Sequence, residues 1–356
     1  MGHPRATSEA EARVAFEAFV RDVRPRVEAR LTSILDLRST EAYRHGTDVG
    51  QMVSAVRDLT LRGGKRLRAA LVVAAFRATG GTDDEAAAID TGVALELLQT
   101  YLLIHDDLMD GDLVRRGGPS VHALMRRHFE DDGRGDSSAI LAGDYTAALA
   151  LDVLTRLPVS AERSLAVVRR FAAIQVDAVY GQQLDVAARP ADVEAMHALK
   201  TGSYTVRGPL MLGASLAGAT AEQEAVLARF AEPLGVAFQL RDDLLGTFGS
   251  LEETGKPFGN DLRAGKRTAL IVEADARLDE AGRRSIARAF GRAVASEDDV
   301  STATKTLETC GARRAVEQRI DTLVTAARAA LASPSLEAVG SVLLSGAAAS
   351  LTSRSS

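Results

Sequence analysis

Four aspartates crowd the segment LLIHDDLMDGDLVRRGG at residues 102–118, at the end of an apolar run. Asp106 and Asp110 are four positions apart, so on a helix they stack on one side, with Asp107 beside them. These carboxylates repel one another, and the helix macrodipole disfavours anions at a C-terminal end. Mg²⁺ relieves both costs, because it takes oxygen ligands, commonly one or two carboxylates together with substrate phosphates. We interpret the cluster as a metal site; a solvated acidic helix end is the alternative for an arbitrary D-D-x-x-D.

Two arginines, Arg115 and Arg116, follow the aspartates directly. A guanidinium presents a planar fork of N–H donors that matches phosphate oxygens. Carboxylates that hold a metal and arginines that hold the other side of a phosphate form one coherent site. The abrupt change of sign therefore favours a metal–diphosphate complex as the ligand.

A second acidic pair lies in FQLRDDLLGTFG, residues 238–249. Gln239, Asp242 and Asp243 share one helix face at three- and four-residue spacing. One such pair is usually an ordinary surface feature, but two pairs that each follow a long apolar helix are a stronger signal. Opposed across a cavity, the two pairs would hold a group of Mg²⁺ ions around one diphosphate.

Basic residues recur at two further breaks in the pattern. RGGKRLRAAL places Lys65, Arg66 and Arg68 at an expected helix start, where free N–H groups and the macrodipole favour phosphate. LKTGSY places Lys200 and Thr201 at another helix break. Solvated basic residues are the alternative interpretation of both segments.

The segment TGKPFGNDLRAGKRTAL is rich in glycine, and Lys256 and Lys266 flank Asp261 in it. We expect a loop able to close over an anion, although glycine-rich surface loops are common.

The elements that must position these residues are helices almost throughout. Alanine, leucine, arginine and glutamate dominate, and all four favour helices. One helix is expected from near Thr82 to about Asp110, with a capping box at Thr82 and Glu85, and a second capping box at Thr220 and Gln223. The sequence predicts an all-α protein, a single domain over residues 1–356 with its core at about 30–350 and frayed termini.

Composition excludes several classes of protein. A chain of 356 residues that is 46% hydrophobic can bury a large core, and its net charge of −5 gives no sign of nucleic-acid binding. The single cysteine, Cys310, excludes an internal disulfide and indicates a reducing compartment. The N-terminus lacks the apolar stretch of a signal peptide, and we expect no apolar run near the ~20 residues of a membrane span. A cytoplasmic location is expected.

The motifs resemble, in one order, those of the trans-isoprenyl diphosphate synthases, the polyprenyl synthetase family. They extend over residues from about 30 to 290: G-G-K-R-L-R at 63–68, I-H-D-D-L-M-D at 104–110, R-R-G at 115–117, G-Q-Q-L-D at 181–185, K-T at 200–201, F-Q-L-R-D-D at 238–243 and G-K-P-F-G-N-D at 255–261.

The resemblance implies a bundle of long helices around a deep central cavity, the isoprenoid synthase fold, in a homodimer. It implies Mg²⁺-dependent head-to-tail condensation of isopentenyl diphosphate with an allylic diphosphate (dimethylallyl, geranyl or farnesyl), with three Mg²⁺ ions in each site. The allylic diphosphate ionises, isopentenyl diphosphate attacks the cation, and a proton is lost.

The resemblance also implies roles, by matching position. It assigns metal binding to Asp106, Asp110 and, from the opposite wall, Asp242, with Asp107 in support. It assigns the allylic diphosphate to Arg115, Lys200 and Lys256. It assigns isopentenyl diphosphate to Lys65, Arg68, Gln99 and Arg116. It places Thr201 and Gln239 near the forming cation, counts Lys200 with them as catalytic, and places Lys266 where the site closes.

One position departs from the family pattern. Many members have aspartate where this chain has Gly246. If the glycine only relaxes the helix end, Gly246→Asp should be tolerated; if it serves backbone geometry or close packing, the substitution should harm activity. A class I terpene cyclase is a poor alternative, because Gly246 and Ser250 stand where its second motif needs Ser or Thr and Glu. A non-catalytic synthase subunit is a further alternative, although the aspartates of the first motif are all present.

Product length depends on the helix below the first motif. Tyr101 lies five positions before Asp106, about 7.5 Å along the axis at ~1.5 Å per residue, and Leu102 lies one turn below Asp106. In the family that the chain resembles, an aromatic residue at this place is a floor that stops elongation, and a second one beside it goes with the C15 product. With the aromatic and without its neighbour, C20 geranylgeranyl diphosphate is expected and C15 farnesyl diphosphate is the alternative. Ordinary core packing is the other explanation of Tyr101.

Overall fold

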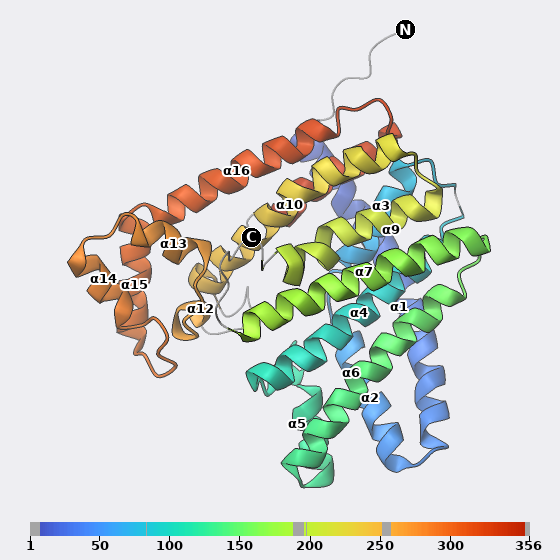
Figure 1. Ribbon diagram of the computed structural model, residues 1–356, viewed down its shortest axis with the longest axis horizontal. Helices are drawn as coiled ribbons and strands as arrows, with labels where there is room; N and C mark the ends of the chain where they lie inside the picture. The colour runs from blue at the N-terminus through green and yellow to red at the C-terminus, as the bar shows by residue number, and fades with distance from the viewer. Residues whose placement is uncertain (1–7, 83, 188–195, 197, 251–257, 353–356) are drawn as a thin grey trace. The chain divides into compact units, whose positions relative to one another are not determined.

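The computed structural model describes residues 8–82, 84–187, 196, 198–250 and 258–352. The first part of the chain forms α1 (Glu9–Tyr43), α2 (Thr47–Leu61), α3 (Leu67–Ala78), α4 (Ala86–Asp110), β1 (Val114–Arg115), β2 (Gly118–Pro119), α5 (Val121–Phe129), α6 (Asp132–Thr155) and α7 (Ala161–Val186). The second part forms η1 (Ala198–Arg207), α9 (Gly208–Ala217), α10 (Ala221–Phe248), α12 (Asn260–Arg263), α13 (Ala269–Asp275), α14 (Glu280–Ala287), α15 (Glu297–Thr309), α16 (Ala312–Ala330) and α17 (Ala338–Thr352). Figure 1 shows this helical architecture.

The prediction of an all-α fold is confirmed. Within the described ranges, β1 and β2 are the only strands, and they pair with each other in an antiparallel hairpin. The chain groups into two compact units. Unit 1 comprises residues 1–176, 204–228 and 333–347, and unit 2 comprises residues 177–203, 229–332 and 348–356. The expectation of a single domain stays a prediction.

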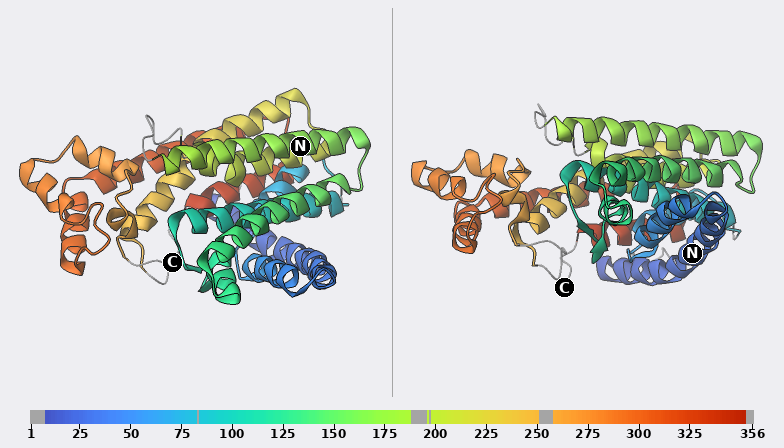
Figure 2. Two further views of the ribbon diagram at one scale, coloured as in Figure 1. Left: turned by 60° about the horizontal axis from the view of Figure 1, so that its bottom comes forward. Right: turned by 90° about the horizontal axis from the view of Figure 1, so that it is seen from below.

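Unit 1 is built around α3 and α4. Every apolar residue of α3 from Ala69 onward is buried, as expected for a helix enclosed by others. It packs against α4 and α9, and α4 packs along α6. Figure 2 gives two further views of the helices. The helix that carries the first acidic motif is therefore fixed on several sides before it reaches its C-terminal end.

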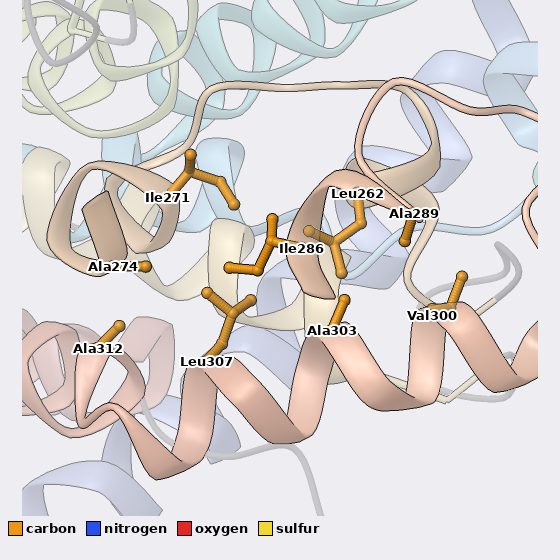
Figure 3. Close-up of a cluster of buried hydrophobic side chains, with 9 residues drawn as sticks. All are labelled: Leu262, Ile271, Ala274, Ile286, Ala289, Val300, Ala303, Leu307 and Ala312. Atoms are coloured by element: carbon orange, nitrogen blue, oxygen red, sulfur yellow. The ribbon is translucent and has the colours of Figure 1, made fainter. Parts of the chain in front are cut away.

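Unit 2 has two apolar clusters. In the first, the part of α10 that belongs to this unit packs against α13 and α16 through Leu240, Leu244, Leu270, Val316 and Ile320. The second, shown in Figure 3, is formed by α12–α15 and the start of α16, and its members are Leu262, Ile271, Ala274, Ile286, Ala289, Val300, Ala303, Leu307 and Ala312. The clusters hold the later part of α10, from residue 229, together with the segment after residue 258.

The capping box predicted at the start of α10 is confirmed. The Gln223 N–H donates to the Thr220 hydroxyl at 3.2 Å, and the Thr220 N–H donates to the Gln223 side-chain oxygen at 2.9 Å. Two of the N–H groups that a helix start leaves without backbone partners are thereby satisfied.

The capping box predicted at Thr82 is wrong. Helix α4 begins at Ala86, and its cap residue, Glu85, makes no side-chain cap hydrogen bond. The Glu85 carboxylate instead forms ion pairs with Arg26 at 2.7 Å and Arg77 at 2.5 Å. Two guanidinium groups from α1 and α3 outcompete the local backbone for this carboxylate.

Two helices of the described chain, α4 and α6, are long and apolar enough to cross a membrane by length and composition alone. Their most apolar stretches are 72% and 50% buried, and the core helix of a soluble protein passes the same test. The expectation that no apolar run approaches spanning length is therefore not confirmed, and the absence of a membrane span stays a prediction.

Candidate active site

The first acidic cluster, defined as Asp106, Asp107 and Asp110, occupies the end of α4. The helix stops at Gly111, whose left-handed conformation (φ 71°) turns the chain back. The Asp106 side chain is 22% exposed and that of Asp107 is fully buried, while Asp110 is exposed. Asp106 and Asp110 are therefore the accessible carboxylates of the cluster, and Asp107 lies within the fold.

Arg115, in β1, is the counter-charge of this cluster. Its Nε donates to Asp107 Oδ1 at 2.5 Å, and its Nη2 lies 3.2 Å from Asp112 and 3.6 Å from Asp106. Burial raises the pKa of Asp107 to about 6, against the opposing effect of the Arg115 hydrogen bond. Asp107 Oδ2 is buried without a hydrogen-bond partner among the residues described. The buried pair of Arg115 and Asp107 thus lies next to the accessible Asp106 carboxylate. The supporting role of Asp107 stays a prediction.

The β1–β2 hairpin determines where Arg115 and Arg116 stand. Arg116 (φ 53°) and Gly117 (φ 71°) both have positive φ, as a two-residue hairpin turn of type I′ requires. The Arg62 guanidinium at the end of α2 donates to the carbonyls of Arg115 at 3.1 Å and Pro119 at 2.9 Å. Sequence reasoning missed both the hairpin and Arg62; the glycine pair after Arg116 was the available signal for the turn.

A buried ion pair lies where the predicted basic segment meets α4. Arg66 caps α3 in the left-handed conformation (φ 51°), and its side chain is 1% exposed. Its Nη1 donates to Glu96 Oε2 at 2.8 Å, and its Nη2 donates to the Thr60 carbonyl at 2.8 Å. The Thr60 hydroxyl in turn donates to that of Thr100 at 3.1 Å. This network links α2, α3 and α4, and no pattern in the residues indicated it.

Arg68, on the first turn of α3, is held by the end of η1. Its Nη2 donates to the Thr205 hydroxyl at 2.9 Å, and its guanidinium lies over the Tyr204 ring, 4.6 Å from the centroid. An aromatic face and a hydroxyl together orient a guanidinium while leaving some of its donors for a ligand. Of the other residues predicted to bind isopentenyl diphosphate, Lys65 is exposed and Gln99 is half-buried.

Arg116 completes a group of cationic side chains in unit 1. Burial lowers its pKa, and repulsion from Arg66, Arg68 and Arg115 lowers it further, whereas Glu96 acts in the opposite direction. A buried guanidinium that three others repel would be stabilised by a bound anion. The structure thus brings Arg68, Arg115 and Arg116, all predicted diphosphate ligands, into one electrostatic neighbourhood.

Tyr101 and Leu102 are both half-buried on α4 below the acidic cluster. The Tyr101 ring packs edge-on against His105, with centroids 4.9 Å apart. The proposed floor residue is therefore held by its neighbour one turn above.

The two aspartates of the second acidic pair, both in unit 2, lie in different environments. Asp242 is exposed, whereas Asp243 is 3% exposed. Asp243 accepts hydrogen bonds from the Gln239 amide at 3.0 Å and from the Ala269 N–H at 3.3 Å. Asp243 therefore fixes the start of α13 against α10, and Asp242 is the more accessible carboxylate of the pair. The metal role of Asp242 stays a prediction. The Gln239 amide is engaged with Asp243, and its predicted place near the forming cation stays a prediction.

Gly246 lies one turn after Asp242, and it is a site of close packing. A Cβ built on Gly246 would lie 2.0 Å from Asp261 Oδ2, far inside van der Waals contact. The Asp261 carboxylate also lies 3.8 Å from Lys266 Nζ, and its side chain is 17% exposed. The Asp261 carboxylate thus occupies the space that an aspartate side chain at position 246 would need. Sequence reasoning noted Asp261 only as the acid between two lysines and missed this contact.

Three predicted site residues lie wholly or partly outside the described structure. Lys256 is outside the described residues. Lys200 and Thr201 belong to η1, a π-helix with i→i+5 pairing, but their side chains are outside the described structure. π-Helical turns are rare and frequently occur at functional sites. The backbone at this pair therefore adopts the kind of irregularity that functional sites favour.

In the part of the chain that is described, no three Asp, Glu, His or Cys side chains converge into a ready-made metal site. Mg²⁺ does not need one, because it commonly binds one or two carboxylates and completes its coordination with water and phosphate. Asp106 and Asp110, accessible and four residues apart, have the donor chemistry for this mode. The residues present therefore fit Mg²⁺ bound together with a phosphate ligand.

The sequence model of the family described as polyprenyl synthetase matches residues 50–307 of this chain. The chain belongs to the polyprenyl synthetase family. A curated relative, geranylfarnesyl diphosphate synthase of Aeropyrum pernix, is 37% identical over 295 residues, which is 79% of this chain and 87% of the relative. Another, geranylgeranyl diphosphate synthase of Mycobacterium tuberculosis, is 36% identical over 292 residues, or 79% of each chain.

Solved structures of the family have the same fold. Geranylgeranyl pyrophosphate synthase from Corynebacterium glutamicum, complexed with isoprenyl diphosphate and magnesium, has a TM-score of 0.86 to this chain at 32% identity. The match covers 96% of this chain and 99% of that one. The fold is therefore the all-α isoprenoid synthase fold, and the resemblance drawn from the motifs is confirmed.

Proposed function

We propose that the protein is a Mg²⁺-dependent prenyltransferase that condenses isopentenyl diphosphate with an allylic diphosphate, head to tail, to give a short-chain prenyl diphosphate. Family membership and relatives named as geranylgeranyl, geranylfarnesyl and farnesyl diphosphate synthases support this reaction class. The allylic partners are dimethylallyl, geranyl and farnesyl diphosphate.

The observation that carries the proposal is that unit 1 contains both accessible carboxylates and a group of guanidinium side chains. Asp106 and Asp110 are accessible carboxylates, and Arg68, Arg115 and Arg116 are crowded guanidinium groups. A diphosphate with bound Mg²⁺ satisfies both groups at once, because its oxygens accept from the guanidiniums and its metal takes the carboxylates. Neither a free anion nor a free cation does so.

Each group has a definite task in such a reaction. Lys65, Arg68 and Arg116 bind isopentenyl diphosphate, with Gln99 beside them. Lys200 and Lys256 join Arg115 on the allylic diphosphate. Asp106, Asp110 and Asp242 would hold Mg²⁺, which would supply positive charge to the leaving diphosphate; we propose three ions in the site. The arginines are fixed by the hairpin, by Tyr204 and by Thr205, so they stabilise charge that develops on the leaving group without reorganising.

We further propose that the main product is geranylgeranyl diphosphate, C20, with farnesyl diphosphate as the alternative. The named relatives include synthases of C15, C20 and C25 products, so the length rests on the residue at the tunnel floor. Tyr101 is half-buried and braced by His105, which suits a rigid stop. Tyr101→Ala should therefore lengthen the products, and Leu102→Phe should shorten them toward C15.

A homodimer and a cytoplasmic location complete the proposal. Large apolar side chains are exposed on α6, among them Ile140 at 48%, Leu141 at 59% and Leu151 at 43%. Exposed apolar residues grouped on one helix favour a protein contact. Light scattering coupled to size-exclusion chromatography should give twice the chain mass of 37.6 kDa.

One assay tests the reaction. Purified protein receives labelled isopentenyl diphosphate, Mg²⁺ and one allylic diphosphate at a time, and the products are dephosphorylated and sized by chromatography. We expect prenyl alcohols of up to C20 that disappear when EDTA is added. Absence of any condensation product with all three allylic diphosphates, from folded dimer, would refute the proposal and favour a non-catalytic subunit.

A matched pair of variants tests the site itself. Asp106→Asn keeps the size of the side chain and removes its charge, whereas Asp321→Asn makes the same change at an exposed position on α16. We expect a loss of turnover by orders of magnitude for the first and no change for the second. Equal activity of the two variants would contradict the assignment of the first acidic cluster.

A further inference from the structure

The ring of Tyr101 is one member of a short array of packed groups that continues into the next helix. The Tyr101 and His105 centroids are 4.9 Å apart with an interplanar angle of 68°, so the rings meet edge to face. On its other side, His105 Nε2 lies 3.2 Å from the carbonyl oxygen of Ile140 in α6. A carbonyl only accepts, so this contact requires the proton on Nε2 and fixes the orientation of the imidazole.

The imidazole fills the space between α4 and α6 at Gly143. A Cβ built on Gly143 would lie 2.2 Å from His105 Nε2 and 2.5 Å from Cδ2. Ordinary contact begins near 3.4 Å, so a methyl group here would force the ring to move by more than about 1 Å. His105 therefore has no free space on the α6 side, and any displacement from that side is passed on toward Tyr101.

Tyr101 has polar neighbours that restrict it further. Its hydroxyl interacts with the Gln175 side chain from α7, and Asp144 of α6 lies close enough to act on it electrostatically. Burial raises the pKa of Tyr101, so the phenol is neutral at physiological pH. Anchored at its hydroxyl and supported along its edge by His105, the ring has one preferred position.

We propose that Gly143 and His105 are positioning residues for product length, because together they determine how far the Tyr101 ring extends into the path of the growing chain. The inference rests on the proposed function and adds to it residues that do not contact the elongating chain. Gly143, on the neighbouring helix α6, lacks a side chain and so leaves room for the His105 ring. His105 in turn packs between α6 and the Tyr101 ring.

Two substitutions should act in opposite directions. Gly143→Ala adds a methyl group behind His105 and drives the imidazole against Tyr101, so the chain should stop earlier and C15 should increase relative to C20. His105→Ala removes the support, so the Tyr101 ring should yield to a longer chain and products beyond C20 should increase. We expect each product ratio to change at least about fivefold, which corresponds to about 1 kcal/mol between competing release and elongation steps.

The double variant Gly143→Ala with His105→Ala separates this mechanism from general damage to α6. Without the imidazole, the added methyl group meets empty space, so the double variant should give the product distribution of His105→Ala alone. Gly133→Ala, on the same helix, is the matched control, since its Cβ would meet only Asp131 Oδ1 at an ordinary 3.5 Å. It should leave the distribution unchanged.

The experiment sizes all products made from labelled isopentenyl diphosphate and geranyl diphosphate and records the total label incorporated. Thermal unfolding of each variant is measured in parallel. The double variant and His105→Ala keep the test available if Gly143→Ala fails to fold. Two results would overturn the inference while leaving the proposed function intact, provided that the wild-type protein condenses its substrates. One is a folded His105→Ala variant with the wild-type product ratios. The other is an equal shift in the product ratios of Gly143→Ala and Gly133→Ala. Absence of condensation by the wild-type protein would overturn both.

Discussion

Glu96→Gln should strongly destabilise unit 1, because it leaves the Arg66 guanidinium buried without its carboxylate. The two side chains are 1% and 3% exposed and their charged atoms are 2.8 Å apart, so solvent cannot replace the lost partner. Removing one member of a buried pair costs about 3–5 kcal/mol. Glu28 lies 3.6 Å from Arg66 Nε and is 32% exposed, so it compensates in part. We therefore expect a loss near the lower limit, about 3 kcal/mol in the free energy of unfolding.

Urea unfolding followed by circular dichroism measures this loss, and the chain provides a control of the same chemistry. Glu280 and Arg284 form an i,i+4 pair at 2.9 Å with side chains 83% and 68% exposed. Glu280→Gln should cost no more than about 0.5 kcal/mol, because exposed pairs contribute little.

The double variant Arg66→Met with Glu96→Leu completes the comparison. It removes both charges and should recover most of the stability that Glu96→Gln loses, since apolar replacement of a whole buried pair is often neutral. If Glu96→Gln proves as stable as Glu280→Gln, the pair is not the structural link between α3 and α4 that we infer. A double variant less stable than Glu96→Gln alone would contradict the same reasoning.

Three shorter predictions concern the rest of the site and the fold. Gly246→Asp should lower both turnover and melting temperature, because its Cβ overlaps the Asp261 carboxylate and adds a like charge; Asp261→Ala in the same chain should restore the melting temperature, and an unperturbed single variant would contradict this. Burial lowers the pKa of the fully buried His122, so the unfolded chain binds a proton that the folded chain does not, and stability should decrease as pH falls below about 6.5. Urea midpoints at pH 5, 6 and 7 for wild type and His122→Gln check this, and equal pH slopes would refute it. Asp242→Ala should reduce turnover by orders of magnitude at saturating Mg²⁺ while preserving the fold, and activity within threefold of wild type would exclude a metal role for this residue.

The predictable parts of the structure are those that short-range chemistry determines. The end of α4 at Asp110 followed from the glycine after it, and the capping box of α10 followed from Thr220 and Gln223 alone. The placement of Asp106 and Asp110 on one side of that helix followed from their four-residue spacing. In each case the interacting groups lie within a few residues, so the periodicity of one element is sufficient.

The unpredicted parts depend on partners that are distant in sequence. Glu85 looked like a capping residue, but Arg26 and Arg77 from two other helices bind it instead. The pairing of Arg66 with Glu96 spans 30 positions, and nothing in either segment identifies the partner. The proximity of Asp261 to Gly246 depends in the same way on how the chain returns to α10. Such contacts are determined by the packing of helices, which a residue pattern on one helix does not contain.

The π-helical segment η1 restricts how the chain can change length. Each of its turns encloses one residue more than an α-helical turn, and α9 follows it without a break. Deleting one residue within 198–207 would favour ordinary α-helical pairing, and each residue in such a helix rotates the chain by about 100°. Positions before the deletion would then face a different direction from Tyr204 and Thr205, which hold Arg68. A substitution at an exposed position such as Arg207 keeps the number of residues, so it does not change the directions in which the other residues of η1 face. Over evolutionary time, this stretch should therefore accept changes of residue far more readily than insertions or deletions.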